Sequence, residues 1–194
     1  ELKSNPPILA RIDSINIEKI TEIKEYKTFE IIQSESSKNK STIISPDIAI
    51  CDDCIEDIND MSNFRYSYSL TNCTNCGPRY SIIKTIPYDR INTSMFSFEL
   101  CEKCKNEYEN PTNRRYHAQP IACEKCGPNV VLYNNKNEVL SSDITAIKEI
   151  AQEINKGSIV AIKGMGGFHL ICDANNDKVV EKLRIRKSRL NKPF

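Results

Sequence analysis

The chain contains 194 residues, which is enough for one ordinary domain or two small ones. Its 39% hydrophobic and 27% charged residues, with only 6 glycines and 9 prolines, exclude collagen-like and low-complexity classes. The net charge of +1 gives the whole chain no attraction for nucleic acid or an anionic membrane. No run approaches the ~18 apolar residues that a membrane-spanning helix needs.

Residues 1–50 contain two runs that are typical of β-strands. Residues 10–17 place Ile15 and Ile17 on one face and polar residues on the other, and residues 28–33 form the second run. The polar stretch at 34–41 has no apolar residue and predicts a loop or linker. Because two strands are not stable alone, we expect them to pair with the rest of the chain or with a sheet upstream of residue 1.

From residue 51 the sequence repeats itself after a shift of 50 positions. Both copies have the form C-x2-C-x18-C-x2-C, and several other residues coincide, among them Arg65 with Arg115 and Gly77 with Gly127. A match that extends beyond the cysteines indicates a duplicated unit. The repeated cysteines are Cys51, Cys54, Cys73, Cys76, Cys101, Cys104, Cys123 and Cys126.

Two C-x-x-C turns can supply the four thiolates of a structural zinc site. A unit that runs from Cys51 to Cys76 is too short to bury an adequate apolar core, whereas structural zinc contributes roughly 10–16 kcal/mol to folding. We therefore predict two structural zinc ions and no catalytic role for them, since four sulfurs close the coordination sphere. A redox-active pair or an iron–sulfur cluster fits the duplicated frame less well.

The ligand pairing is favoured within each unit, because a duplicated unit should be self-contained, and sites that combine both units are the alternative. We expect Gly77 and Gly127 to adopt the left-handed conformation. In each mid-loop we expect a tyrosine, Tyr66 or Tyr116, to cover the zinc while arginines bond loop carbonyls, or else to contact a neighbouring domain. His117 is expected to be structural rather than a ligand.

The compartment and the class of partner follow from the thiols and the local charge. Close thiol pairs and an N-terminus without an apolar leader favour the cytoplasm, and the missing initiator Met indicates a processed product or a piece of a longer chain. Residues 51–128 contain nine Lys/Arg and eleven Asp/Glu, and two tetrathiolate zinc sites add further negative charge. We therefore expect no nucleic-acid binding by the zinc region.

After residue 130 the pattern changes to α/β. A helix is predicted over 144–156 with Ser142 or Asp143 as its N-cap and Gly157 at its C-terminal end. A buried strand at 158–163, a tight loop at 164–167, a strand at 168–172 and a helix at 177–187 follow. The unpaired Cys172 lies in an apolar strand and is expected to pack rather than to act as a nucleophile.

Residues 178–192 contain seven basic residues and one acid. Backbone amides at the glycine loop and the side chains of Lys187, Arg189 and Lys192 could converge on a phosphate group. A solvated helix face is the alternative, because the loop lacks both the dinucleotide fingerprint and the Walker motif.

These motifs together resemble the hydrogenase-maturation carbamoyltransferases of the HypF family, over essentially the whole chain. The most specific segments are the doubled cysteine frame and residues 72–79, 87–90, 114–120, 163–174 and 184–194. Phe64 replaces the first of two arginines that the second unit keeps. The implied α+β, multi-part fold comprises the end of an acylphosphatase-like domain (1–34), a linker (35–50), two zinc-finger units (51–78 and 101–128), two connections (79–100 and 129–140), and the start of a YrdC-like domain (141–194).

The resemblance implies a relay from carbamoyl phosphate through carbamate and ATP to carbamoyl adenylate, and then to the C-terminal cysteine of a hydrogenase-maturation partner, as a source of cyanide. It implies ATP contacts by Lys187, Arg189 and Lys192, and a carbamate loop at Lys163, Gly164, Gly166 and Gly167. No catalytic residue of the acylphosphatase-like site falls in this chain, so we expect the segment to be inactive alone. The alternative is an autonomous zinc-binding module that recognises proteins without catalysis.

Overall fold

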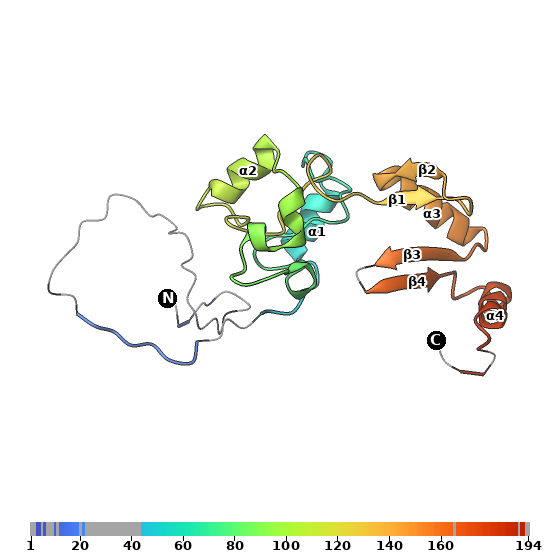
Figure 1. The fold of residues 1–194 in the computed structure, drawn as a ribbon, viewed down its shortest axis with the longest axis horizontal. Helices are drawn as coiled ribbons and strands as arrows, with labels where there is room; N and C mark the ends of the chain where they lie inside the picture. The colour runs from blue at the N-terminus through green and yellow to red at the C-terminus, as the bar shows by residue number, and fades with distance from the viewer. Residues whose placement is uncertain are drawn as a thin grey trace.

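The computed structural model describes residues 3, 4, 6, 10, 12–19, 21, 44–164, 166–189, 191 and 192. Residues 44–129 form a finger region of short helices and turns, and residues 130–192 form two strand pairs and two helices. Figure 1 shows the finger region in cyan through green and the α/β part in yellow through orange to red. This mixture of elements confirms the predicted α+β, multi-part fold.

Each finger unit opens with a helix that begins directly after its first cysteine. α1 spans Asp52–Asn59 and α2 spans Glu102–Glu109, so the two helices are related by the same shift as the cysteines. Cys51 and Cys101 have extended backbones, and acidic residues in each first turn interact favourably with the positive end of the helix dipole. This start buries the second cysteine of each unit in the first helical turn.

The connection between the units consists of turns and three short 3-10 helices, η1 at Tyr80–Ile82, η2 at Arg90–Asn92 and η3 at Ser94–Ser97. Its apolar side chains join the two units in a small cluster of buried residues, which are Tyr68, Ile82, Met95 and Ala122. The expected connection is therefore a packed element that draws side chains from both units.

In the first unit, the buried cluster formed by the repeated cysteines contains no other residue. Cys54, Cys73 and Cys76 are fully buried and pack against Cys51. The second unit adds Ala118 and Ile121 to its buried cysteines. The described residues of each unit thus have little apolar core apart from the sulfurs, as the short repeat predicts.

The α/β part begins with an antiparallel strand pair, β1 at Val131–Tyr133 and β2 at Val139–Ser142, with a bulge at Leu132/Tyr133. Helix α3 at Asp143–Asn155 follows and contacts β1, β2 and the next strand. The second antiparallel pair is β3 at Val160–Gly164 and β4 at Gly167–Ile171, and helix α4 occupies Asp177–Arg186. Figure 1 shows α3 between the two strand pairs.

The predicted helices agree with the structure to within one residue at each end. Ser142 and Asn176 are the N-caps of α3 and α4, and Gly157 after α3 has a φ of +87°. The strands at 158–163 and 168–172 are also present, shifted by one or two residues as β3 and β4. No helix within the described residues is long and apolar enough to span a membrane.

Three predictions about strands are corrected or lie outside the described residues. Residues 12–17 form no strand, and Ile17 is 92% exposed, because no described segment pairs with them. The run at 28–33 lies outside the described residues. The strand expected to be buried at 158–163, observed as β3, is largely exposed because its only described strand partner is β4.

Candidate metal centre

The eight repeated cysteines gather into two clusters, one in each unit. Within each cluster the four Sγ atoms lie within 4.8 Å of one another, and all the thiols are free. No cluster in the described part of the chain combines cysteines of both units. The clusters thus have the composition that closure within each unit predicts: Cys51, Cys54, Cys73 and Cys76 in the first, and Cys101, Cys104, Cys123 and Cys126 in the second.

The spacing of the sulfurs fits a tetrahedral zinc ion. The Sγ atoms of Cys51 and Cys73 are 3.6 Å apart, and those of Cys73 and Cys76 are 3.8 Å apart. The two corresponding distances in the second unit are both 3.7 Å. Zn–S bonds of about 2.3 Å require sulfurs about 3.8 Å apart, whereas disulfide sulfurs lie about 2.05 Å apart. Each cluster would hold one zinc ion with four sulfur ligands, which is the closed geometry of a structural site.

The thiols of a cluster differ in acidity because they hydrogen-bond one another. The hydrogen bond with Cys54 lowers the pKa of Cys73 to about 4 against the effect of burial, and the N–H of Asn75 also donates to its Sγ at 3.3 Å. The same contact with Cys73, together with burial, raises the pKa of Cys54. Burial raises the pKa of Cys104 in the second cluster. A metal ion must therefore displace protons from buried thiols when it binds.

Gly77 and Gly127 occupy equivalent positions after the last cysteine of each unit, but for different physical reasons. Gly77 has a φ of +95°, as predicted. Gly127 does not adopt a positive φ, so that part of the prediction is wrong. A Cβ at Gly127 would lie 2.4 Å from the Oη of Tyr68 and 2.5 Å from the Cβ of Ala122. Glycine is required there by the close approach of Tyr68 of the first unit and of Ala122 of its own unit.

Arg65 of the first unit reaches into the second unit. Its side chain is buried, with 1% exposure, and its Nε donates to the carbonyl oxygen of Ala122 at 2.9 Å. Its Nη2 donates to the Sγ of Cys104 at 3.3 Å and forms an ion pair with Glu107 at 2.5 Å. A cation of the first unit thus contacts a sulfur of the second cluster.

Arg115 makes the equivalent contacts in the opposite direction. Its Nε donates to the carbonyl oxygen of Asn72 at 2.9 Å, and its Nη2 contacts the Sγ of Cys54 at 3.7 Å and pairs with Asp57. The partners are shifted by 50 positions from those of Arg65, so the two units are related by an approximate two-fold exchange. Each unit gives an arginine to the other's cluster.

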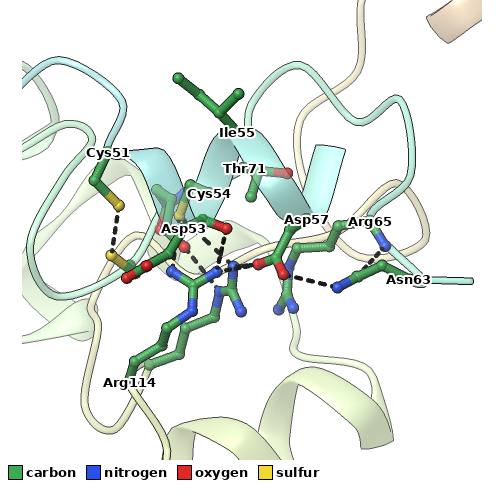
Figure 2. A network of polar contacts seen from close by, with 12 residues as sticks. Cys51, Asp53, Cys54, Ile55, Asp57, Asn63, Arg65, Thr71 and Arg114 are labelled. Atoms are coloured by element: carbon green, nitrogen blue, oxygen red, sulfur yellow. Dashed lines mark hydrogen bonds and ion pairs between the residues drawn. The ribbon is translucent and has the colours of Figure 1, made fainter. Parts of the chain in front are cut away.

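Arg114 adds a second cation to the first cluster. Its Nη1 donates to the Sγ of Cys54 at 3.1 Å, and its Nη2 donates to the carbonyl oxygen of Asp53 and pairs with Asp57, as Figure 2 shows. The equivalent residue of the first unit is Phe64, whose ring lies 4.2 Å below the guanidinium of Arg65. The departure at Phe64 therefore leaves the second cluster with a single arginine donor among the described residues.

The mid-loop predictions are partly right. The arginines do bond loop carbonyls, but these carbonyls belong to the other unit. Tyr66 is 46% exposed, so it does not seal the first cluster as expected. His117 belongs to neither cluster and packs against the rings of Tyr108 and Tyr116 at centroid distances of 4.7 and 4.6 Å, in agreement with a structural role.

Asp57 and Glu107 are functional residues that the sequence analysis did not single out. Both lie on the inner side of the finger helices and anchor the crossing arginines. They occupy equivalent positions of the repeat, one as aspartate and the other as glutamate. An acidic residue at the same position of both units, together with the repeated arginine, was the signal available in the sequence.

The predicted phosphate-binding residues are only partly brought together. Lys187 and Arg189 line an open cavity of about 600 Å³ between β4 and α4, whose wall includes His169 and the half-buried Cys172. The other candidates do not line this cavity. Lys163, Gly164 and Gly167 lie at the end of the β3–β4 hairpin with Gly166 between them, and Lys192 accepts a hydrogen bond from Arg184 at its carbonyl oxygen.

Two protein-family models match the chain. The model described as HypF finger matches residues 50–83 and 100–133, once for each cysteine unit. The Sua5/YciO/YrdC model, described as telomere recombination, matches residues 152–194. The first matched segment ends one residue after η1, and the second ends with β1, so the cysteine units match as complete repeats.

Curated carbamoyltransferases are similar over the whole chain. The probable carbamoyltransferase HypF of Methanocaldococcus jannaschii is 50% identical over 195 residues, covering 100% of this chain and 25% of that protein. Carbamoyltransferase HypF2 of Cupriavidus necator is 49% identical over 194 residues, covering 100% of this chain and 24% of that protein. The chain therefore spans about a quarter of the length of the curated relatives that it matches.

Solved structures agree with this similarity. A full-length HypF in the phosphate- and nucleotide-bound form superimposes with a TM-score of 0.81 at 46% identity, covering 100% of this chain and 25% of that one. The HypF of T. kodakarensis gives a TM-score of 0.74 at 51% identity over 80% of this chain and 20% of that one. Fold and clusters define a double zinc finger that continues into a YrdC-like region. The chain belongs to the HypF family of carbamoyltransferases.

Proposed function

We propose that this chain is the zinc-stabilised scaffold of a carbamoyltransferase that acts in the maturation of nickel–iron hydrogenase. The observation that carries the proposal is the match to HypF carbamoyltransferases, whose sequences are 50% and 49% identical to this chain over its whole length. Since the chain spans about a quarter of those relatives, the complete reaction requires a longer protein. The segment alone is inactive.

In that longer protein the reaction is a carbamoyl relay. Carbamoyl phosphate is hydrolysed at the acylphosphatase-like site to carbamate and phosphate. A carbamate oxygen then attacks the α-phosphorus of ATP at the YrdC-like site, so that carbamoyl adenylate forms and pyrophosphate leaves. The C-terminal cysteine thiol of the maturation partner accepts the carbamoyl group and AMP is released.

The residues of this chain contribute positive charge to the ATP step. Lys187 and Arg189 follow α4 and line the cavity beside β4, where their cations would offset the negative charge of a triphosphate. Lys192 extends the same basic segment. Lys163, Gly164, Gly166 and Gly167 are the candidates for the carbamate end, because a hairpin turn rich in glycine allows close approach of a small ligand.

The two zinc ions have a structural role in this scheme. Zinc held by four sulfurs supplies folding free energy and no open coordination position, so no step of the relay passes through it. The finger region then holds the acylphosphatase-like and YrdC-like sites at a fixed spacing, in a reducing cytoplasm where the thiols stay free. A partner with a C-terminal cysteine fits this scheme, and nucleic acid does not.

The proposal is tested in a full-length protein that carries this segment. Pyrophosphate release from ATP should depend on carbamoyl phosphate, and the isolated segment should release none. Lys187→Ala combined with Arg189→Ala should weaken ATP binding severalfold or more. Lys178→Ala combined with Lys182→Ala removes the same charge from exposed sites on α4 that do not line the cavity, and it should leave binding unchanged.

Two results would reject the assignment. Pyrophosphate release that is independent of carbamoyl phosphate would contradict the proposed carbamoyl relay. Equal ATP affinities for the cavity variant and its matched control would remove Lys187 and Arg189 from the nucleotide site.

A further inference from the structure

The contacts between the two finger units link one cysteine cluster to the other, and we propose that the two clusters bind metal cooperatively. The inference rests on the proposed zinc binding and extends it, because two closed sites without such contacts would fill independently. Arg65, Arg114 and Arg115 are positioning residues in this account. They act through the sulfurs of the opposite unit and do not touch the metal.

A continuous polar path joins the two clusters. It runs from Cys54 to Arg115 at 3.7 Å and from Arg115 to Glu107 at 3.6 Å. It continues from Glu107 to Arg65 at 2.5 Å and from Arg65 to Cys104 at 3.3 Å. Arg65 and Arg115 are 1% and 3% exposed, so solvent screens this path little.

Charge determines the direction of the coupling. Four thiolates and one Zn²⁺ leave each filled cluster with net negative charge, which a buried guanidinium from the other unit stabilises through charge-assisted hydrogen bonds. Without metal, the buried cluster that could hold that guanidinium in place consists of cysteines alone in the first unit, and the second unit adds only Ala118 and Ile121 to its buried cysteines. Metal in one unit therefore fixes the arginine that the other cluster needs, and the effect is reciprocal.

The two clusters differ in the number of crossing arginines that they receive. Cys54 receives both Arg114 and Arg115, whereas Cys104 receives Arg65, and Phe64 occupies the place of a second arginine. We therefore expect the second cluster to lose more affinity when its single crossing arginine is changed.

Arg79 directly follows the first unit and provides a matched control, because it is a buried arginine whose contacts with that unit do not cross to the second. Its guanidinium donates to the carbonyl oxygens of Cys73, Thr74, Cys76 and Pro78, all in the first unit or directly after it. Arg79→Lys should therefore weaken the first cluster directly, and it should leave the affinity of the second cluster unchanged when the first cluster is filled with zinc, whereas Arg65→Lys should lower that affinity under the same condition.

The experiment titrates the reduced, metal-free chain with Zn²⁺ and measures the species with no, one and two ions by native mass spectrometry. Independent sites, whether equal or unequal, give at least about half of the molecules with one ion at half-saturation. We expect clearly less than that. Alkylation of free thiols followed by peptide mass spectrometry reports the occupancy of each cluster.

The variants assign the coupling to the crossing arginine. Arg65→Lys should lower the Zn²⁺ affinity of the second cluster by about tenfold, although residue 65 lies in the first unit. Disabling the first cluster with Cys51→Ser and Cys73→Ser should weaken the second cluster by a similar factor. Adding Arg65→Lys to that background should cause little further loss, because both changes remove the same contact.

Each other outcome overturns the proposal. If at least half of the molecules carried one ion at half-saturation, and two ions were bound at saturation, the coupling would be rejected and zinc binding would stand. The proposed coupling would also be rejected if Arg65→Lys left the Zn²⁺ affinity of the second cluster unchanged. It would be rejected as well if Arg65→Lys and Arg79→Lys changed that affinity equally. Failure of the native chain to bind zinc would overturn this inference and the proposed zinc scaffold together.

Discussion

Single residues in the finger region carry an unusual amount of the fold because the apolar core is small. Removing one partner of a buried ion pair generally costs about 3–5 kcal/mol, since the other charge is left buried and unpaired. Two such pairs are present, Arg65 with Glu107 and Arg115 with Asp57. Each arginine also donates a hydrogen bond to a main-chain carbonyl of the other unit. These four side chains hold the two units against each other.

Gly127 tests how closely the units approach. Gly127→Ala should lower the free energy of unfolding of the zinc-loaded chain by about 1–3 kcal/mol, because the new Cβ overlaps Tyr68 and Ala122. Gly166→Ala is the matched control, since a Cβ there has no atom within 4 Å and should change stability by less than about 0.5 kcal/mol. Denaturant unfolding measures both, and equal effects would contradict the packing described for Gly127.

The acidity of the thiols predicts how zinc binding depends on pH. Cys54 has its pKa raised by its hydrogen bond with Cys73 and by burial, and Cys104 has its pKa raised by burial. Both thiols are protonated in the metal-free chain near neutral pH and must release protons to the solvent when zinc binds. Apparent zinc affinity should therefore rise as pH rises through neutrality and fall as pH drops.

Chelator competition at several pH values measures this dependence, and calorimetry in buffers of different ionisation enthalpy counts the protons released. A zinc affinity that does not change with pH would mean that the thiols are already ionised in the metal-free chain.

The ligand residues could be predicted from the sequence because the signal is local. Spacing and duplication place the eight cysteines in two groups without any tertiary information. The crossing of the arginines could not be predicted, because contacts such as Arg65 with Cys104 join positions far apart in the sequence. Gly127 was misjudged for a related reason, since close contacts with Tyr68 of the other unit and Ala122 of its own unit explain it, and a positive φ does not.

Among the elements, α1 and α2 depend most on the clusters. Each has eight residues, which is shorter than the ~12–15 that an isolated helix needs to persist in water. Each begins at a cysteine and buries a second cysteine one turn later. Helix α3 has thirteen residues and packs against strands of its own part of the chain.

Metal removal should therefore act on particular elements. In excess chelator and reductant, amide protons of α1 and α2 should exchange with solvent much faster, while those of α3 change little. Hydrogen exchange followed by peptide mass spectrometry compares the elements within one sample. Native protection of α1 and α2 in the chelated chain would contradict the role of the sulfur clusters as the core of the finger region.

Element prediction succeeded where a periodic pattern was long and its ends were marked. Helix α3 has apolar residues at helical spacing and a glycine at its C-terminal end, and α4 follows an asparagine cap. The β1–β2 pair was missed because each strand is only three or four residues long and carries a bulge. The strand expected at 10–17 has the right alternation, but alternation does not supply a partner strand.

At the scale of the whole molecule, the finger region is one body made of two mutually dependent units. Three features join the first unit to the second: the buried apolar cluster that contains Tyr68 and Ala122, the crossing arginines, and the contact between Tyr68 and Gly127. Figure 1 shows this body beside the α/β part that follows it in the chain.

The whole-molecule organisation was predicted mainly from the family resemblance. The duplicated frame alone predicts two zinc units, and the α/β pattern after residue 130 predicts a change of architecture. The domain boundaries at 34, 140 and between the units come from the resemblance and stay predictions. The dependence of each cluster on the other unit is not part of the resemblance and follows from the contacts of Arg65 with Cys104 and of Arg115 with Cys54.

The most direct test of this account is the zinc content of the purified, reduced chain, measured by elemental analysis together with protein concentration. The account predicts two zinc ions per chain and loss of both from a chain whose cysteines are replaced by serine in both units. A folded, monodisperse chain that holds no zinc, or whose cysteines are joined as disulfides, would contradict it.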